Sequence, residues 1–260
     1  MFEKKGKKGQ VTIFIIIGII IVAVALLIYS FYPKIRTTLG IEESTPQSYI
    51  QSCLEDEIKN TVDVLSKQGG KITPETYLMY QDEKIEYLCY TDEFYVPCVI
   101  QQPMLKSAIE LEIKNEIEEE VNSCFNSLKS SYEGKGYSVD MKTGNKKIDL
   151  LPQKIISSFN YSFTLTKGSD VQKYDSFSVV MNNNLYELVG IANSIIEWET
   201  NYGDAEIAIY MTYYNNLKVE KILRSSGNKI YIITDRETGD KFQFASQGQI
   251  WPAGYAKVVV

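Results

Sequence analysis

The pattern of apolar and polar positions divides the chain into one long apolar run and a body of shorter periodic segments. The run is Val11–Tyr32, and no charged side chain occurs between Gly9 and Pro33. As a helix with a rise of about 1.5 Å per residue, it would be about 33 Å long, and the hydrocarbon core of a bilayer is about 30 Å thick. The pattern therefore predicts a transmembrane helix over these residues.

Three segments of the body have apolar residues at the three-to-four-residue spacing of a helix. They span residues 46–68, 103–128 and 185–202. The second has the clearest stripe, because glutamates occupy its opposite faces. Gly69-Gly70 ends the first segment, and Gly203 follows the third. We expect three amphipathic helices that each face a core.

Segments rich in aromatic and β-branched residues occupy the rest of the body. Residues 85–89 and 94–98 flank a turn at 91–93, which predicts a hairpin. Further strands are expected at 137–141, 147–150, 155–166, 174–180, 205–214, 219–224, 229–234 and 241–245, with turns at 143–145 and 235–240. Consecutive strands with few crossovers predict an α+β ectodomain on a single N-terminal transmembrane helix.

This order of segments predicts five parts of the chain. They are a basic cytoplasmic leader (1–10), a transmembrane or pilin-stem helix (11–32), a linker (33–45), a helical, disulfide-linked subdomain (46–132) and a strand-rich α+β subdomain (133–260).

Charge sets the expected orientation of the chain. The first 36 residues carry six basic side chains and one acidic one, so their net charge is +5. The net charge of the whole chain is −6, so the remaining residues carry a net charge of −11. Lys4, Lys5, Lys7 and Lys8 precede the apolar run, and the positive-inside rule keeps them in the cytoplasm. We expect a single-pass protein of the cell membrane with an extracellular body. The acidic body also excludes nucleic acid as a partner.

The four cysteines all follow the apolar run: Cys53, Cys89, Cys98 and Cys124. An even number in an exported body favours two disulfides. The expected hairpin would bring Cys89 and Cys98 together, which leaves Cys53 and Cys124 on the apolar sides of two helices. The other two connectivities and four buried thiols remain open. Zinc is disfavoured, because there is no C-x-x-C pair and no histidine.

Cleavage by a signal peptidase is a weaker alternative to a permanent anchor. Ala23-Val24-Ala25 fits a small-x-small site, but it lies within the apolar run, which Leu26, Leu27 and Ile28 continue. Aromatic residues from Tyr29 to Tyr32 would instead lie at the outer membrane interface.

A third interpretation rests on the string Lys7-Lys8-Gly9-Gln10-Val11-Thr12-Ile13-Phe14. It resembles the class III, prepilin-like leader of archaeal surface proteins, over the N-terminal segment only. The resemblance implies a cut between Gly9 and Gln10, after which the apolar run would form the stem of a filament. Many pilins have glutamate at the fifth position after the cut, where this chain has Phe14.

The familiar signatures of catalysis are missing from the sequence. Without histidine there is no Ser-His-Asp or Cys-His arrangement, and no P-loop, dinucleotide-binding or EF-hand motif occurs. Asp235–Asp240 has the spacing of a turn, not of a calcium loop, and Glu118–Glu120 fits a solvated helix face. We therefore expect no enzyme, no cofactor and no catalytic or metal-binding residue.

One modification signal remains. Asn160-Tyr161-Ser162 is a glycosylation sequon in the part that we expect to be exported. Asn160 is therefore a candidate acceptor.

Together these features predict a non-enzymatic, membrane-anchored cell-surface protein that acts in binding or envelope structure. The alternative is a pilin-like subunit, with the membrane helix mediating a homo-oligomer or filament. The sequence identifies no protein partner and no ligand.

Overall fold

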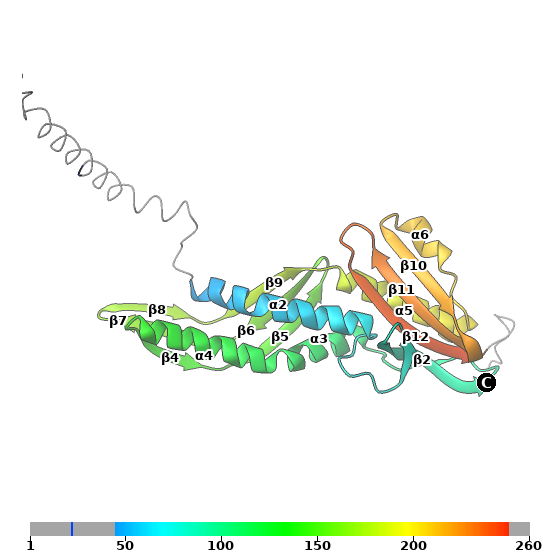
Figure 1. Ribbon diagram of the computed structural model, residues 1–260, viewed down its shortest axis with the longest axis horizontal. Helices are drawn as coiled ribbons and strands as arrows, with labels where there is room; N and C mark the ends of the chain where they lie inside the picture. Colours follow the sequence, from blue (N-terminus) through cyan, green and yellow to red (C-terminus); the bar gives the residue numbers. More distant parts are fainter. Residues whose placement is uncertain (1–21, 23–44, 250–260) are drawn as a thin grey trace, which may run out of the picture. The chain divides into compact units, whose positions relative to one another are not determined.

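The computed structural model describes Val22 and residues 45–249 (Figure 1). The chain divides into two units, residues 1–46 and 47–260. The predicted leader, apolar run and linker lie outside the described residues, except for Val22 and Thr45. Among the helices in the described part, none is both long and apolar enough to cross a membrane. The described body is an α+β fold of helices and mixed sheets.

Helix α2 (Pro46–Lys67) confirms the first predicted helix. Its apolar stripe is buried: Ile50, Leu54, Ile58, Val62 and Leu65. Two glycines with positive φ end it, Gly69 at 75° and Gly70 at 90°. A side chain at Gly69 would lie 2.9 Å from the Cβ atom of Glu86. The turn therefore needs glycine for both its backbone angles and its space.

The second predicted helix is divided into α3 (Leu105–Glu116) and α4 (Glu118–Gly134). They meet at Ile117, whose ψ of 0° departs from helical geometry. The Ile117 N–H still donates to the Ile113 carbonyl (3.1 Å). Only one turn is therefore irregular, and the apolar stripe stays buried on both sides of it.

Six strands after α4 form an antiparallel meander. The meander consists of three long strand lines, and each line is interrupted once, so that it contains two strands. The six strands are β4 (Ser138–Lys142), β5 (Lys146–Leu151), β6 (Lys154–Phe159), β7 (Ser162–Lys167), β8 (Asp170–Tyr174) and β9 (Phe177–Asn182). The breaks separate two three-stranded sheets, β4-β7-β8 and β5-β6-β9. The predicted strand 155–166 is therefore two strands. The predicted turn at 143–145 is such a break, because β4 and β5 pair with other strands instead of each other.

One face of the meander is buried against the helices, and the other is open. Along β6 and β7, residues alternate between fully buried and partly exposed. Phe125 of α4 packs against Phe159, Tyr161 and Phe177, with ring centroids 6.1, 4.2 and 5.0 Å away. This aromatic cluster joins the helices to the inner face of the strands.

A third sheet contains strands from both ends of the body. Its strands are β1 (Tyr77–Tyr80), β2 (Glu83–Phe94), β3 (Val99–Ile100), β10 (Leu217–Leu223), β11 (Asn228–Asp235) and β12 (Lys241–Gln249). Their order is β1-β2-β12-β11-β10, with β3 on β2, and β12 runs parallel to β2. Helix α5 (Leu185–Tyr202) packs on this sheet, and it confirms the third predicted helix and its terminal Gly203.

Two local predictions in this part are wrong. The expected turn at 91–93 lies within β2, and the chain reverses later, around Tyr95 with its φ of 64° and Pro97, which has no N–H to donate. The expected strand 205–214 contains helix α6 (Ala208–Tyr213). Tyr210 is buried there, and its hydroxyl lies 2.8 Å from Ser194 Oγ of α5. Packing against α5 thus overrides the local strand propensity.

Contacts cross the expected boundary between residues 132 and 133. Residues 47–260 form one compact unit. Strand β2 lies before that boundary and pairs with β12 after it, while α3 packs on β5. The strands of one expected subdomain therefore complete the sheet of the other.

Candidate functional site

Both predicted disulfides are present. Cys53 of α2 is bonded to Cys124 of α4, and Cys89 of β2 is bonded to Cys98 before β3. Of the three connectivities that four cysteines allow, the structure has the one expected from the hairpin and the two apolar stripes. The first bond ties α2 to the helix that covers the meander, and the second closes the loop between β2 and β3.

Of the other predicted site residues, only Asn160 lies within the described part of the chain. Gly9 and Gln10, the candidate cleavage site, lie outside the described residues. Asn160 is exposed between β6 and β7. Within the described part, Cys53, Glu120 and Cys124 are close enough together to suggest a metal site. The sulfurs of the two cysteines are bonded to each other, however, so they cannot act as thiolate ligands.

The segment Asp235–Asp240 is a turn, as its spacing predicts. Asp240 accepts a hydrogen bond from the N–H of Asn184, the residue directly before α5 (2.8 Å). Burial alone would raise the pKa of Asp235. Hydrogen bonds from the backbone N–H groups of Glu237 and Thr238, and from two asparagine amides, together lower that pKa below its ordinary value. These carboxylates therefore serve the turn and the helix.

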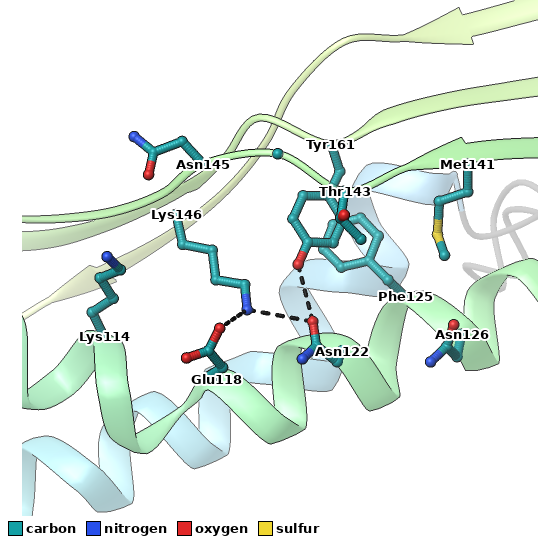
Figure 2. A pocket seen from close by; sticks show the side chains of 11 residues that line it. Lys114, Glu118, Asn122, Phe125, Asn126, Met141, Thr143, Asn145, Lys146 and Tyr161 are labelled. Atoms are coloured by element: carbon teal, nitrogen blue, oxygen red, sulfur yellow. Dashed lines mark hydrogen bonds and ion pairs between the residues drawn. The ribbon is translucent and has the colours of Figure 1, made fainter.

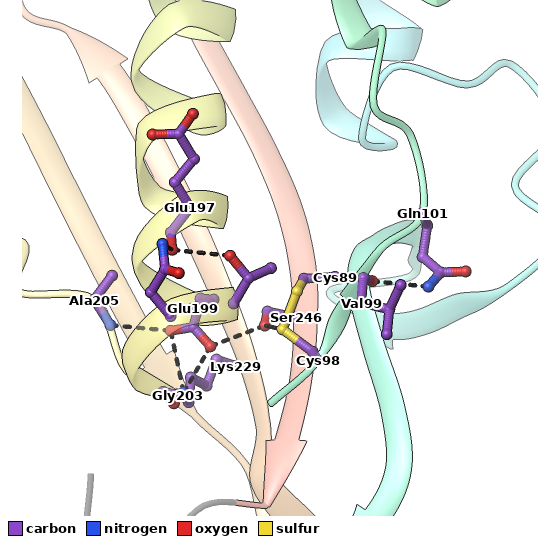
Figure 3. The surroundings of a disulfide bond; sticks show 12 residues. Cys89, Cys98, Val99, Gln101, Glu197, Glu199, Gly203, Ala205, Lys229 and Ser246 are labelled. Atoms are coloured by element: carbon purple, nitrogen blue, oxygen red, sulfur yellow. Dashed lines mark hydrogen bonds and ion pairs between the residues drawn. A yellow bond between two sulfur atoms is a disulfide. The ribbon is translucent and has the colours of Figure 1, made fainter. Parts of the chain in front are cut away.

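A buried cluster of charged and polar groups joins the end of α5 to β11 and β12. The Glu199 carboxylate is fully buried and lies 2.8 Å from Lys229 Nζ. It also accepts hydrogen bonds from the Ala205 N–H (3.1 Å), the Ser246 hydroxyl (3.0 Å) and the Tyr231 hydroxyl. Figure 3 shows Ser246 between this carboxylate and the Cys89–Cys98 bond.

In this Glu199 cluster, the negative charge of the carboxylate is balanced within the core by the positive charge of Lys229. Burial first, and the neighbouring Glu199 charge second, raise the pKa of Tyr231 far above its ordinary value, so the tyrosine donates and does not ionise. Lys229 is held further by the Gly203 carbonyl and by Asp204 at 3.3 Å. The protein's own donors thus occupy both oxygens of the carboxylate.

The Glu199 cluster is not among the sequence-based predictions, although the sequence contains a signal for it. Glu199 continues the apolar stripe of α5 at helical spacing after Ala192, Ile195 and Ile196. Lys229 and Tyr231 lie at alternate positions of β11, on the same buried side as Ile233, and Ile230 between them is buried on the other side. A charged residue at a core position of each element indicates a buried pair, but which acid meets which base depends on tertiary packing.

A polar groove lies beside the strand breaks, between α4 and the β4–β5 line. Its volume is about 530 Å³, and Lys114, Asn126, Thr143 and Asn145 are among its lining residues. Figure 2 shows Lys146 reaching into it, with Nζ 2.7 Å from a Glu118 oxygen and 3.3 Å from Asn122 Oδ1.

The side chains of the groove suit hydrogen bonding more than acid–base chemistry. The Tyr161 hydroxyl donates to Asn122 Oδ1 (3.1 Å), which fixes that amide. The hydrogen bond that Glu118 accepts from Lys146 lowers the pKa of Glu118, so the two charges neutralise each other. The amides and hydroxyls around this ion pair offer donors and acceptors to a polar ligand.

A further cleft of about 470 Å³ lies between α5 and the segment after it. Tyr210, Tyr214 and Glu187 are among its lining residues. Burial raises the pKa of Tyr210, so its hydroxyl stays protonated beside Ser194. One oxygen of Glu187 accepts from the Gln153 N–H (3.0 Å), and the other is buried and has no hydrogen-bond partner among the described residues.

Comparison with known proteins adds no identification. No family model matches this chain, and no curated protein and no solved structure is similar to it.

Proposed function

We propose that this chain is a non-enzymatic, single-pass protein of the cell surface whose body acts outside the cell in binding or envelope structure. In this proposal Val11–Tyr32 stays in the membrane, the leader lysines stay in the cytoplasm, and residues after Tyr32 are exported.

The observation that carries the proposal is the pair of disulfides behind the apolar run. Disulfides form and persist in oxidising compartments, and they are rare where thiols are kept reduced. Cys53–Cys124 and Cys89–Cys98 use every cysteine of the chain. An exported body explains both bonds and agrees with the charge asymmetry around the run.

The body suits binding or a structural role. Its helices are tied by a disulfide, and its polar groove beside α4 presents amides and hydroxyls. The buried charges of the Glu199 cluster are held by the protein's own groups, which favours a structural role for them.

Protease digestion of intact cells tests the orientation. The body should be digested from outside, while the chain should stay in the membrane pellet after carbonate washing. As a matched variant, replacing Lys4, Lys5, Lys7 and Lys8 by glutamate should reduce the accessible fraction, because the positive-inside signal is reversed. A body that is protected in intact cells and carries four free thiols would refute the proposal.

The alternative function is a pilin-like filament subunit, and the leader string around Gly9-Gln10 favours it. In that case the apolar run leaves the bilayer and packs in the core of the filament. Phe14, in place of an acid, weakens the resemblance, so we rank the anchor first.

The N-terminal residue of the native protein distinguishes the two functions. Mass spectrometry should find Met1 for an anchor and Gln10 for a processed pilin. Gln10 at the N-terminus of protein recovered from filaments would establish the alternative, and Met1 in assembled material would exclude processing.

A further inference from the structure

The single N-x-S/T sequon of the chain lies where the meander is interrupted. Asn160 and Tyr161 are the two residues between β6 and β7, outside both strand ladders. The Asn160 side chain is exposed, whereas Phe159 and Tyr161 on either side are buried, at 0% and 1% exposure. Asn160 therefore projects from the open face, away from the helices.

The backbone at this position is held firmly. The Asn160 N–H donates to the Asn145 carbonyl (2.9 Å). The Asn160 carbonyl oxygen lies so close to Gly144 that a Cβ atom there would be 1.9 Å away. These contacts fix the backbone where the two adjacent strand lines are interrupted. The Asn160 side chain therefore points in one direction.

The surroundings leave space for a large substituent. Small hydroxyl residues share the open face along β6 and β7, all partly exposed: Ser158, Ser162, Thr164 and Thr166. Ser162, which the sequon requires, lies two residues after Asn160 and so on the same face. Within residues 45–249, the Asn160 carboxamide has no hydrogen-bond partner to lose on modification.

We infer that Asn160 carries an N-linked glycan that covers the open face of the meander. The Asn160 amide nitrogen attacks the anomeric carbon of a lipid-linked oligosaccharide. The C–N bond forms, the bond from that carbon to the lipid phosphate oxygen breaks, and the amide proton leaves with the phosphate. This inference rests on the proposed export of the body, because such transfer occurs on exported segments.

The structure also sets the time of transfer. In the folded body Tyr161 is buried, and its hydroxyl bonds Asn122 on α4. The tripeptide cannot leave the sheet to enter a transferase without opening the aromatic cluster around Phe125. Transfer therefore precedes closure of the meander.

Peptide mapping of the full protein from its own cells tests the site. Trypsin should release Ile155–Lys167 with added sugar mass, which fragmentation should assign to Asn160. Ser162→Ala breaks the sequon and should remove that mass, whereas the matched variant Ser162→Thr keeps the sequon and should retain it. Sugar that persists in Ser162→Ala, or on another residue, would overturn the assignment.

The same sample separates this inference from the proposed function. An unmodified Ile155–Lys167 in protein with both disulfides and a protease-accessible body would overturn the glycan and leave the function standing. An unmodified peptide in protein with free thiols and a protected body would overturn both.

Cell membranes with their lipid-linked oligosaccharide test the timing. The synthetic peptide Ile155–Lys167 should be modified, and unmodified full chain that was folded beforehand should not. Equal modification of the two would overturn the order of events, and an unmodified peptide would overturn the sequon as an acceptor.

Discussion

At the scale of single residues, the body contains a charge where its sequence pattern expects an apolar side chain. Glu199 is fully buried, and Lys229, Tyr231 and Ser246 surround its carboxylate. Burial of two charges is expensive, and their attraction compensates only when further hydrogen bonds satisfy both groups. Removal of one charged partner should therefore lower the free energy of unfolding far more than removal of both.

Glu199→Leu should lower the free energy of unfolding by about 3–5 kcal/mol, because it leaves Lys229 charged in the core. The double variant Glu199→Leu/Lys229→Met should recover a large part of that loss. Urea denaturation measures both. Glu197→Gln, an exposed position on the same helix, is the control and should change stability by less than about 0.5 kcal/mol. Equal losses in the single and double variants would contradict this account.

The lowered pKa of Asp235 gives the body a dependence on acid pH. A carboxyl whose folded-state pKa is depressed stabilises the fold above its unfolded-state pKa, and this stability is lost as the pH falls through the folded-state pKa. From about pH 6 to about pH 2.5, Asp235→Asn should lose less stability than the unmodified protein does. Asp92→Asn, an exposed carboxyl, should behave like the unmodified protein in these denaturation curves.

At the scale of elements, helix side chains cover the free edges of the β5-β6-β9 sheet. Gln47 Oε1 and Nε2 lie 3.4 and 2.5 Å from the Ser178 N–H and carbonyl, and Gln51 makes the same pair of bonds with Val180 at 3.2 and 3.3 Å. At the opposite edge, a Glu110 oxygen accepts from the Leu150 N–H (2.8 Å). These side chains take the place of a neighbouring strand and block edge-to-edge association.

Gln47→Ala/Gln51→Ala should cost about 1–3 kcal/mol, because the partly exposed bonds of each glutamine together contribute about 0.5–1.5 kcal/mol per side chain. Hydrogen exchange at the Ser178 and Val180 amides should accelerate. Asn60→Ala, at an exposed position of α2, should leave both amides protected. Unchanged exchange in the double variant would mean that the glutamines do not cover the edge.

The two disulfides should differ in their contribution because they close loops of different length. Cys53 and Cys124 are 71 residues apart, and Cys89 and Cys98 only 9. Chain entropy then predicts losses of about 4.4 kcal/mol for the Cys53→Ser/Cys124→Ser variant and about 2.6 kcal/mol for Cys89→Ser/Cys98→Ser. Thermal unfolding of the two variants measures the difference, and the reverse order would show that local packing outweighs loop closure.

At the scale of the whole molecule, the described body is one unit closed by its ends. Strand β12 lies between β11 and β2, so the sheet requires residues from before α3 and from near the end of the described chain. The meander likewise needs α2 and α4 to cover its inner face. The largest sheet and the main core cluster therefore each draw on residues from both sides of residue 133.

Residues 133–249 expressed alone should therefore fail to fold, because β11 and β12 would lack β2 and the meander would lack its helices. Residues 45–249 are the matched control and should fold. Circular dichroism and the dispersion of amide NMR signals measure both. A cooperative thermal transition of the shorter fragment would instead support a domain boundary at residue 133.

The sequence by itself determined the features that depend on local periodicity. Apolar spacing located α2 and α5, and alternation located β10, β11 and most of the meander. The expected hairpin and the two helical stripes favoured the cysteine pairing that the structure has, although the sequence left the other connectivities open. These predictions succeeded because neighbouring residues along the chain carry the whole signal.

Only the tertiary structure decided what depends on residues far apart in the sequence. It turned residues 208–213 into a helix, placed β2 beside β12, brought Lys229 to Glu199 and laid two glutamines along the edge of β9. The residues that meet in the last three of these features are 30 or more positions apart in the sequence. The helix forms through its contact with α5. No local pattern specifies such partners, because they are selected by the packing of whole elements.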